Sequence, residues 1–533
     1  MLAAAIEYQQ SAQTSYAEST EAFEGLKEYL GSREAHKMTE ADLERELNRR
    51  GKELMRQLLQ GHLKSRGPGE AAGPVEDSDG VERSEQRWHQ RDVETTFGAV
   101  DVDRIGYASE GCESLHPLDG SLNLPPERYS LEVRHQIAES AASRSFDETL
   151  LDLARHTGAE VPKRQAEELV LRAAQDFDAF YEARREEEGQ VQPEGTVLVL
   201  TFDGKGVVMH RQDLREMTRK AARARQQHKE RLSKLFKRLS KGEKANSKRM
   251  ATVAAVYTVD PFVRTPEEFL ASLMPPKPKP GKKTKIIRPR PQAKRVWASV
   301  EKESWQVILE GLEEAQRRDP ERLKTWIVVV DGAEHQLDLI EEMAEAFEAK
   351  VTIIVDIIHV TEYIWKAAHV FHREGSPELE YWAWTRVRGV LEGRASTIAG
   401  AMRRAATVAN LSADKRKPVD KCADYLLKYS PYLRYDSYLT AGYPIASGVI
   451  EGACRYLVRD RMELTGARWR LVGAEAVLRL RALRASGDFD AYWDFHEARE
   501  HHRNHARRYA GGTVPALAAP PAPRPHPRLR RVK

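Results

Sequence analysis

Three acidic residues stand where their carboxylates can act together as metal ligands. Asp203 and Asp331 each close an apolar, β-branched run, 196–203 and 326–331, and each is followed by glycine. Such uncharged runs predict buried strands of a covered sheet, and the two strands would deliver both carboxylates to one edge. Glu451 lies far downstream in a helical pattern, beside an apolar face. Mg²⁺ prefers oxygen ligands in octahedral geometry, so this set predicts a metal centre of the kind used by two-metal nucleases and strand-transfer enzymes.

Two other carboxylates compete for places in this set. Asp356 also closes a buried run, 351–356, and is the rival of Asp331, while Glu463 is the rival of Glu451. We favour Asp331 because a glycine follows it in the predicted loop, and Glu451 because a Ser-Gly pair precedes its helix. An Asp-Gly pair also simply ends strands, so each aspartate alone is a weak signal.

The distribution of positive charge is more informative than its sum. The chain has 533 residues, enough for two to four domains, and a net charge of only +4. Between Arg211 and Arg249, however, 15 Lys and Arg face 4 Asp and Glu, and both 277–295 and the C-terminal tail are basic and proline-rich. Any one such run is also typical of a solvated face or a disordered tail. Three of them beside a carboxylate set indicate a nucleic-acid partner.

The cysteines and the apolar segments exclude two classes of protein. Cys112, Cys422 and Cys454 lie far apart, with neither a disulfide framework nor zinc-ligand spacing. No apolar stretch approaches the ~20 residues that span a bilayer. We therefore expect a soluble protein without a membrane partner, cytoplasmic and, through its basic segments, associated with the nucleoid.

The order of the patterns predicts an α/β fold with a mixed sheet, preceded by a mainly helical region. A polar linker is expected at 67–84 and a hairpin at 93–104, with Gly98 near its turn. The expected segments are a helical segment with its linker (1–90), a hairpin and helix pair (91–190), the first part of the sheet with its basic arm 211–249 (191–360), an all-helical insertion (361–440), the last part of the core with the Glu451 helix (441–510) and a disordered basic tail (511–533).

The helix pair has the pattern of a helix-turn-helix. A short helix over 146–155 ends at Thr157-Gly158, and a second opens at Pro162, with Val161 as the expected buried residue of the turn. The side chains expected at the N-terminal end of the second helix, the end that approaches the major groove in DNA readers, are Lys163, Arg164 and Gln165. An ordinary helical hairpin is the alternative.

Two further segments are candidate DNA contacts. The basic arm is predicted to be helical with a thin apolar stripe, and its candidate phosphate contacts are Arg219, Lys220, Arg223 and Arg225. Downstream, Arg468, Trp469 and Arg470 are suited to clamping and stacking on DNA. A buried tryptophan with surface arginines is the alternative for the second group.

Four ordered motifs give the chain a resemblance to a known family. They are Phe202-Asp203-Gly204, Val330-Asp331-Gly332, Asp356-Ile-Ile-His359 and Ala446-Ser447-Gly448-Val-Ile-Glu451. Their order, with 120 residues between Asp331 and Glu451, resembles that of the DDE transposases. The closer similarity is to bacterial insertion-sequence transposases of the Kra type, relatives of the Mutator and hAT-like group, over roughly residues 90–510.

The resemblance implies a ribonuclease-H-like core with an all-helical insertion before the catalytic glutamate. It implies that Asp203, Asp331 and Glu451 hold two Mg²⁺ or Mn²⁺ ions for cleavage at transposon ends and strand transfer into target DNA. It makes His359 a catalytic candidate, either near the scissile phosphate or hydrogen-bonded to Asp356. Both DNA partners and a homo-oligomer, a dimer or larger, are implied as well. A non-catalytic DNA-binding derivative and a ribonuclease-H-like nuclease without strand transfer are the alternatives.

Overall fold

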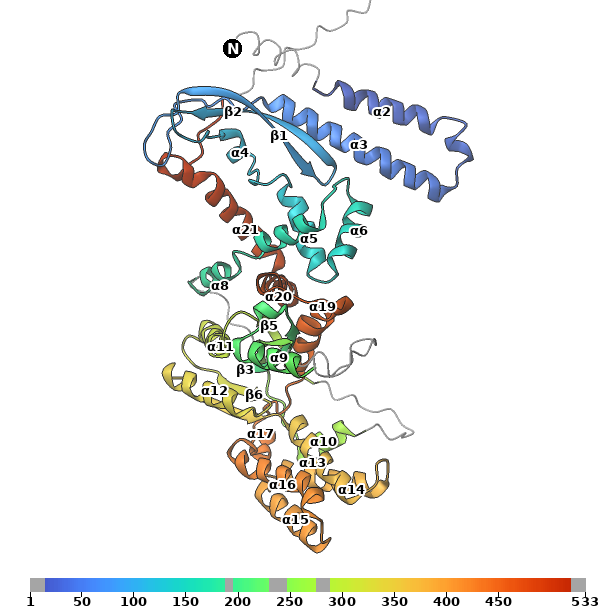
Figure 1. Cartoon of the computed structure of the whole chain (residues 1–533), viewed down its shortest axis with the longest axis vertical. Helices are drawn as coiled ribbons and strands as arrows, with labels where there is room; N and C mark the ends of the chain where they lie inside the picture. Colours follow the sequence, from blue (N-terminus) through green and yellow to red (C-terminus); the bar gives the residue numbers. More distant parts are fainter. Residues whose placement is uncertain (1–14, 187–194, 230–246, 275–287, 519–533) are drawn as a thin grey trace, which may run out of the picture. The chain divides into compact units, whose positions relative to one another are not determined.

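The computed structural model describes residues 15–186, 195–229, 247–274 and 288–518, without the side chains of 225–229. The chain forms two compact units (Figure 1). Unit 1 comprises Met1–Phe180 and Phe489–Lys533, and unit 2 comprises Tyr181–Asp488. The middle of the basic arm and most of the tail lie outside the described residues.

A five-stranded mixed sheet forms the centre of unit 2. Its strands run in the order β5 (Gln292–Ser299), β4 (Lys248–Val259), β3 (Val197–Val208), β6 (Thr325–Val330) and β7 (Val351–Val355). The neighbouring pairs β5–β4 and β4–β3 are antiparallel, whereas β3–β6 and β6–β7 are parallel. The uncharged parts of the central strands are buried, as predicted: Val197–Phe202 of β3, Ala251–Thr258 of β4 and Trp326–Val330 of β6. The predicted α/β class with a mixed sheet is confirmed.

Helices cover this sheet and follow it. The helix α11 packs against β3 and β4, and α20 packs against β5. The region after residue 360 is helical, as predicted. The helices of unit 2 are α9 (Glu216–Lys229), α10 (Pro266–Leu273), α11 (Ser304–Arg318), α12 (Glu334–Ala346), α13 (Ile357–Phe371), α14 (Pro377–Leu391), α15 (Ala395–Val408), α16 (Ala413–Lys428), α17 (Tyr435–Thr440), α18 (Gly448–Ala453), α19 (Asp460–Met462) and α20 (Leu471–Ser486), and α8 (Phe177–Glu186) spans the boundary between the units.

The strand β3 is longer than its sequence predicts. We expected it to end at Asp203, but it continues through Gly204 to Val208. The antiparallel partner β4 explains the difference, because its register pairs Asp203 with Val253 and extends to the pair Val208–Lys248. A partner strand that satisfies the backbone overrides the local tendency of Asp-Gly to turn.

Unit 1 contains the predicted hairpin, in a longer form. The strands β1 (Glu85–Thr95) and β2 (Gly98–Ala108) pair in register up to Thr95 and Gly98, so a two-residue turn joins them. Gly98 has a φ of 116°, a conformation that favours glycine. The helix α3 (Glu40–Arg66) packs against β2, after α2 (Ala17–Leu30).

The prediction of a flexible linker at 67–84 is wrong, because this segment is packed against the rest of unit 1. Val75 is buried in a cluster with Ile105, Tyr107 and Tyr509, and Arg83 forms a buried ion pair with Asp77. The tail is also ordered at its start, because Ala72 N–H donates to Ala516 O and Ala518 N–H donates to Glu70 O. Polar, glycine-rich composition therefore did not imply disorder here, since a few apolar anchors fix both segments.

The remaining helices of unit 1 pack around a buried ionic network. They are α4 (Pro117–Ser121), α5 (Leu131–Ala141), α6 (Phe146–His156), α7 (Lys163–Ala173) and α21 (Phe489–Asn504). We expected residues 489–504 in the same part as the Glu451 helix, but they belong to unit 1. The reason is polar: Arg134 of α5 is fully buried and donates to Glu127 and Glu500, while His496 bonds to Asp176.

The search for membrane-spanning segments gave a negative result. Among the residues that the structure describes, no helix has both the length and the apolar character needed to cross a bilayer.

Replacing Arg134 with leucine should destabilise unit 1 strongly. The change removes the arginine that bridges the buried Glu127 and Glu500, which keep Arg172 and Arg503 respectively as ion-pair partners, and breaking a buried pair in this way costs about 3–5 kcal/mol. Arg45→Leu removes an ion pair with Asp42 in which both partners are exposed, and should cost less than about 1 kcal/mol. Denaturant unfolding, with hydrogen exchange of α5 and α21 as the local probe, measures both. Equal losses would contradict the role given to Arg134.

Candidate active site

The parallel register of β3 and β6 places Asp203 and Asp331 at the same level of the sheet. Thr201 pairs with Val329, so a continuation by two residues sets Asp331 beside Asp203. A step of two returns to the same face, and neighbouring strands lie about 4.8 Å apart. Asp203 is partly exposed within β3, and Asp331 is partly exposed directly after β6. The structure thus brings the two predicted aspartates together.

Glu451 approaches this pair from the helix α18. This helix packs against β3 and β4, and Glu451 is exposed on it. One turn later, the Cys454 thiol donates a hydrogen bond to Asp203 Oδ2 at 3.1 Å. Burial, and then the carboxylates of Asp203 and Glu451, raise the pKa of Cys454, so the thiol stays protonated and keeps donating. Both carboxylates therefore act on one thiol, which sequence reasoning did not single out.

The helix that carries Glu451 changes its geometry immediately afterwards. Residues Cys454–Arg459 form a π-helix, and Arg481 of α20 donates to the carbonyl oxygens of Tyr456 and Leu457 in it. π-helical turns are rare and often lie at functional sites. The guanidinium group of Arg481 therefore satisfies two backbone carbonyl groups of this π-helical turn.

A tyrosine of the helical region fixes the loop after β6. Tyr425 of α16 donates from its hydroxyl to the carbonyl oxygen of Asp331 at 3.1 Å, and Ala333 N–H donates to Asp331 Oδ1 at 3.0 Å. Gly332 has a φ of 85°, which suits glycine at this turn. Burial raises the pKa of Tyr425, so its hydroxyl remains a donor.

Asp356, the rival of Asp331, is buried and fully engaged. It is 1% exposed; its Oδ1 accepts from Ile358 N–H at 2.7 Å, and its Oδ2 accepts from the backbone N–H and the hydroxyl of Ser447. Ser447 is the N-cap position of α18, the helix of Glu451. Asp356 therefore caps α13 and holds the start of α18, which makes it a positioning residue and supports Asp331 as the ligand.

His359 and Glu463 have different surroundings from those of the aspartates. His359 is half-buried in the first turn of α13, and the described residues show no hydrogen bond between it and Asp356, contrary to one of our two expectations.

Glu463, the rival of Glu451, forms ion pairs with Lys248 at 3.5 Å and Arg459 at 3.7 Å. Among the described residues no ion pair involves Glu451, so its oxygens are the more available.

The carboxylate set fits an oxygen-ligand cation by chemistry, though the three groups are not drawn into one tight cluster. Asp203, Asp331 and Glu451 form no ion pair among the described residues, and the nearest cation with a recorded effect is Lys205, whose charge acts on the Cys454 thiol beside Asp203. A different group, in unit 1, has ligand atoms that all lie within 4.8 Å of one another. It consists of Asp176, His496 and Glu500, and among the described residues it is the group whose spacing would allow it to hold a metal ion. Neither motif nor spacing in the sequence indicates this second group.

The prediction that Trp469 stacks on DNA is wrong, because this side chain is buried. Trp469 is 7% exposed, donates from Nε1 to Met462 O at 3.0 Å and pairs through its backbone with Val208 and His210. It is a core residue that anchors the chain beside the end of β3, so it does not offer a face for base stacking. Arg468 is exposed, and Arg470 forms an ion pair with Asp213 at 3.0 Å.

The predicted helix pair is present as α6 and α7, which pack against each other. Ala159, rather than Val161, is the buried residue of the turn. Lys163 and Arg164 are exposed at the start of α7, where they pair with Asp147 and Glu168, and Gln165 is half-buried. These three residues remain candidates for DNA contact.

The basic arm begins as the helix α9. Lys220 and Arg223 are exposed on it, Arg219 is half-buried, and the side chain of Arg225 lies outside the described part. At the far end of the arm, Arg249 donates to the carbonyl oxygens of Val300, Glu301 and Asp213. Arg249 is therefore structural, whereas the candidate phosphate contacts named above, Arg219, Lys220, Arg223 and Arg225, all belong to α9.

Comparison with known proteins found no match, either among protein-family models or among curated proteins.

Alanine at Asp356 and at Asp331 should affect stability very differently. Asp356→Ala leaves buried donors of Ser447 and Ile358 without an acceptor, which should lower the free energy of unfolding by roughly 2–4 kcal/mol. Asp331→Ala removes a partly exposed carboxylate with one local hydrogen bond and should cost less than about 1 kcal/mol. Denaturant unfolding of the two variants compares them directly. A larger loss for Asp331→Ala would reverse the two roles.

Proposed function

We propose that the chain is a DNA transposase that cleaves transposon ends and transfers strands by metal-dependent phosphoryl transfer. The observation that carries the proposal is the parallel register that sets Asp203 beside Asp331, under the helix that bears Glu451. Carboxylates from two adjacent strands and one covering helix form an all-oxygen set without cationic partners among the described residues. Such a set suits hard divalent cations.

The strand order supports a ribonuclease-H-like core. Three strands that follow one another in the chain pair antiparallel, and β6 and β7 then extend the sheet in parallel beyond β3. Helices fill the sequence between β7 and the Glu451 helix, where the resemblance to DDE transposases implies an all-helical insertion. The resemblance and the strand order therefore both support the proposal of a ribonuclease-H-like core.

The chain's own residues would hold and orient the reacting groups. Asp203, Asp331 and Glu451 would hold two Mg²⁺ or Mn²⁺ ions, which when bound stabilise the attacking and leaving oxygens of an in-line displacement. Asp203 is fixed by the ladder of β3 and by the Cys454 thiol, and the Asp331 loop is fixed by Tyr425. Asp356 fixes the start of the Glu451 helix through Ser447. His359 is half-buried in the first turn of α13 and remains a candidate for contact with a DNA phosphate.

The proposed partners are transposon-end DNA, target DNA and further copies of the chain. Lys163, Arg164 and Gln165 at the start of α7 are the proposed readers of the end sequence, and Lys220 and Arg223 on α9 the proposed backbone contacts. Two ends must be brought together for transposition, which requires a dimer or a larger assembly. The enzyme would act on nucleoid DNA.

Conservative substitution of the three carboxylates should abolish cleavage while preserving DNA binding. Asp203→Asn, Asp331→Asn and Glu451→Gln each remove a ligand charge with little change of volume. We expect cleavage of an end-containing duplex in Mg²⁺ to fall more than ~100-fold, the upper range for changes that only support a ligand. Gel-based cleavage and fluorescence anisotropy with the same duplex measure activity and binding separately.

Glu463→Gln is the matched control, because Glu463 lies in the same region but is already ion-paired. It should leave cleavage near the level of the unmodified protein. An active Asp331→Asn variant would remove Asp331 from the set. Cleavage without strand transfer would favour a nuclease, and DNA binding without either activity would favour a non-catalytic derivative.

Replacing Lys163, Arg164 and Gln165 together with alanine should reduce specific binding more than non-specific binding. Base contacts specify a sequence and are worth about 1–3 kcal/mol each, whereas phosphate contacts only position the protein. The control Arg45→Ala with Arg49→Ala removes two exposed positive charges from α3 in the same unit. Competition titrations with end DNA and unrelated DNA give the specificity ratio. A uniform loss for both DNAs would limit the three residues to backbone contact.

A further inference from the structure

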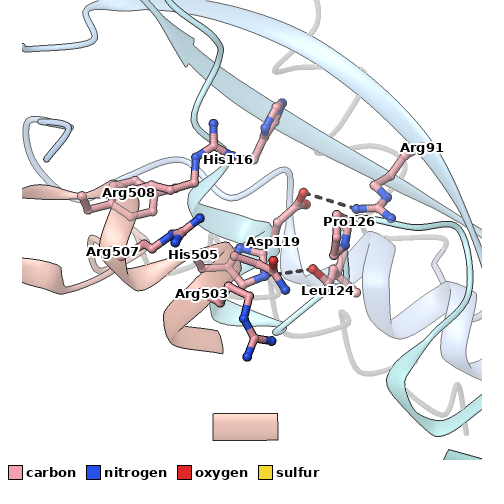
Figure 2. A pocket seen from close by; sticks show the side chains of 11 residues that line it. Arg91, His116, Asp119, Leu124, Pro126, Arg503, His505, Arg507 and Arg508 are labelled. Carbon is pink, nitrogen blue, oxygen red and sulfur yellow. Dashed lines mark hydrogen bonds and ion pairs between the residues drawn. The ribbon is translucent and has the colours of Figure 1, made fainter. Parts of the chain in front are cut away.

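A basic pocket of about 290 Å³ lies within unit 1 (Figure 2). Its walls come from β1, from the segment around α4 and from the residues that end and follow α21. Arginines 91, 503, 507 and 508 line it together with His116 and His505, and Asp119 is the single acidic residue among the described lining residues. The volume is below the range typical of drug-sized ligands and suits a small anion.

The positive charge of this pocket is only partly compensated. The Asp119 carboxylate already pairs with Arg104 and, at 3.5 Å, with Arg91. Arg503 is paired with Asp176 and Glu500. By contrast, Arg508 reaches the exposed carboxylate of Glu113 at 3.4 Å, which is a weak surface contact. Arg507 is exposed, and no ion pair of it is found within the described ranges. Two guanidinium groups are therefore available to an anion.

Both histidines of the pocket have a lowered pKa, first because they are buried and to a smaller extent because arginines lie nearby. Burial, followed by the charge of Arg104, lowers the pKa of His116 to about 3. Burial also lowers the pKa of His505 to about 4, against the raising effect of its hydrogen bond to Leu124 O at 2.8 Å. An anion among these side chains would relieve the repulsion that arises when they are protonated.

Two buried polar atoms at the pocket wall lack partners, and they have opposite character. Asn504 Nδ2 is a donor without an acceptor, and Asp119 Oδ1 is an acceptor without a donor, among the described residues. Buried polar atoms are nearly always hydrogen-bonded, so each of these atoms is available to a water molecule or to a ligand. A singly protonated phosphate satisfies both, because its oxygens accept from Asn504 and its hydroxyl donates to Asp119. A fully ionised sulfate has no such hydroxyl.

We propose that this pocket binds a phosphate monoester or inorganic phosphate, held by Arg507, Arg508 and Asn504 and recognised through its hydroxyl by Asp119. A terminal 5′-phosphate of a nucleic-acid strand and free phosphate share this chemistry, whereas the internal phosphodiester has no hydroxyl. The inference goes beyond the proposed function, because all lining residues belong to unit 1 and the carboxylate set belongs to unit 2.

Calorimetric titration of the full chain with inorganic phosphate tests the site. We expect saturable binding at one site, with sulfate bound at least tenfold more weakly. Arg507→Gln with Arg508→Gln should weaken phosphate binding at least tenfold, and Asn504→Ala, which changes no charge, should weaken it several-fold. The matched control is Arg87→Gln with Arg128→Gln, which removes two exposed charges from the same unit, outside the pocket, and should leave affinity unchanged.

Competition with oligonucleotides distinguishes the two sources. If a 5′-phosphorylated strand displaces phosphate and its 5′-hydroxyl counterpart does not, the ligand is a nucleic-acid end; if neither displaces it, the ligand is free phosphate. The proposal is overturned if phosphate does not saturate, if sulfate binds equally well, or if the control variant loses as much affinity as the pocket variant. Asp203→Asn should keep full phosphate binding, so a failure of this site and a failure of the proposed transposase activity are separable.

Discussion

The parallel pairing of β3 with β6 is the constraint on which the candidate active site depends. The ladder from Val197–Thr325 to Thr201–Val329 determines which residues stand side by side where β6 ends. A slip by one residue would turn Asp331 to the opposite face of the sheet from Asp203. The paired parts of both strands, Val197–Thr201 of β3 and Trp326–Val329 of β6, are buried, so such a slip would have to exchange their core contacts. The hydrophobic core therefore specifies the position of the carboxylates, and one of its members, Cys454, also donates a hydrogen bond to Asp203.

The same ladder continues into β7 and brings a third aspartate to this level, since Val330 pairs with Val355. Burial then separates the roles of the three residues. A buried carboxylate is tolerated only when its oxygens are hydrogen-bonded, and Asp356 meets this condition through Ile358 and Ser447. Asp203 and Asp331 remain partly exposed and have no cationic partner within the described residues. Asp356 is thus a structural residue of the site. Its hydrogen bond from Ser447 fixes the start of the Glu451 helix relative to the end of β7.

The sequence predicted those parts of the fold that local patterns determine. The apolar runs gave the strands of the sheet, and the 3.6-residue periodicity gave the helices after residue 360. The errors arose where a distant partner decided the outcome. The continuation of β3 depends on β4, the burial of Val75 depends on Tyr107 and Tyr509, and Trp469 is buried because its backbone pairs with Val208. Neither Cys454 beside Asp203 nor the network of α21 with α5 has a local signal in the sequence.

A comparison of the Asp176 group of unit 1 with the Asp203 group of unit 2 shows why the spacing of ligand atoms alone does not define a metal centre. Asp176, His496 and Glu500 have the right separation, yet Arg503 donates to both carboxylates and Arg134 donates to Glu500 and contacts His496 Nε2 at 3.1 Å. A cation entering there would meet guanidinium groups that already neutralise its ligands. In unit 2 the ligand atoms are less tightly grouped, but Asp203, Asp331 and Glu451 form no ion pair among the described residues. Negative charge without an ion-pair partner attracts a divalent cation, and the bound cation would offset the mutual repulsion of the carboxylates. The looser group is therefore the better candidate for a metal centre, and the tighter one is the core of unit 1.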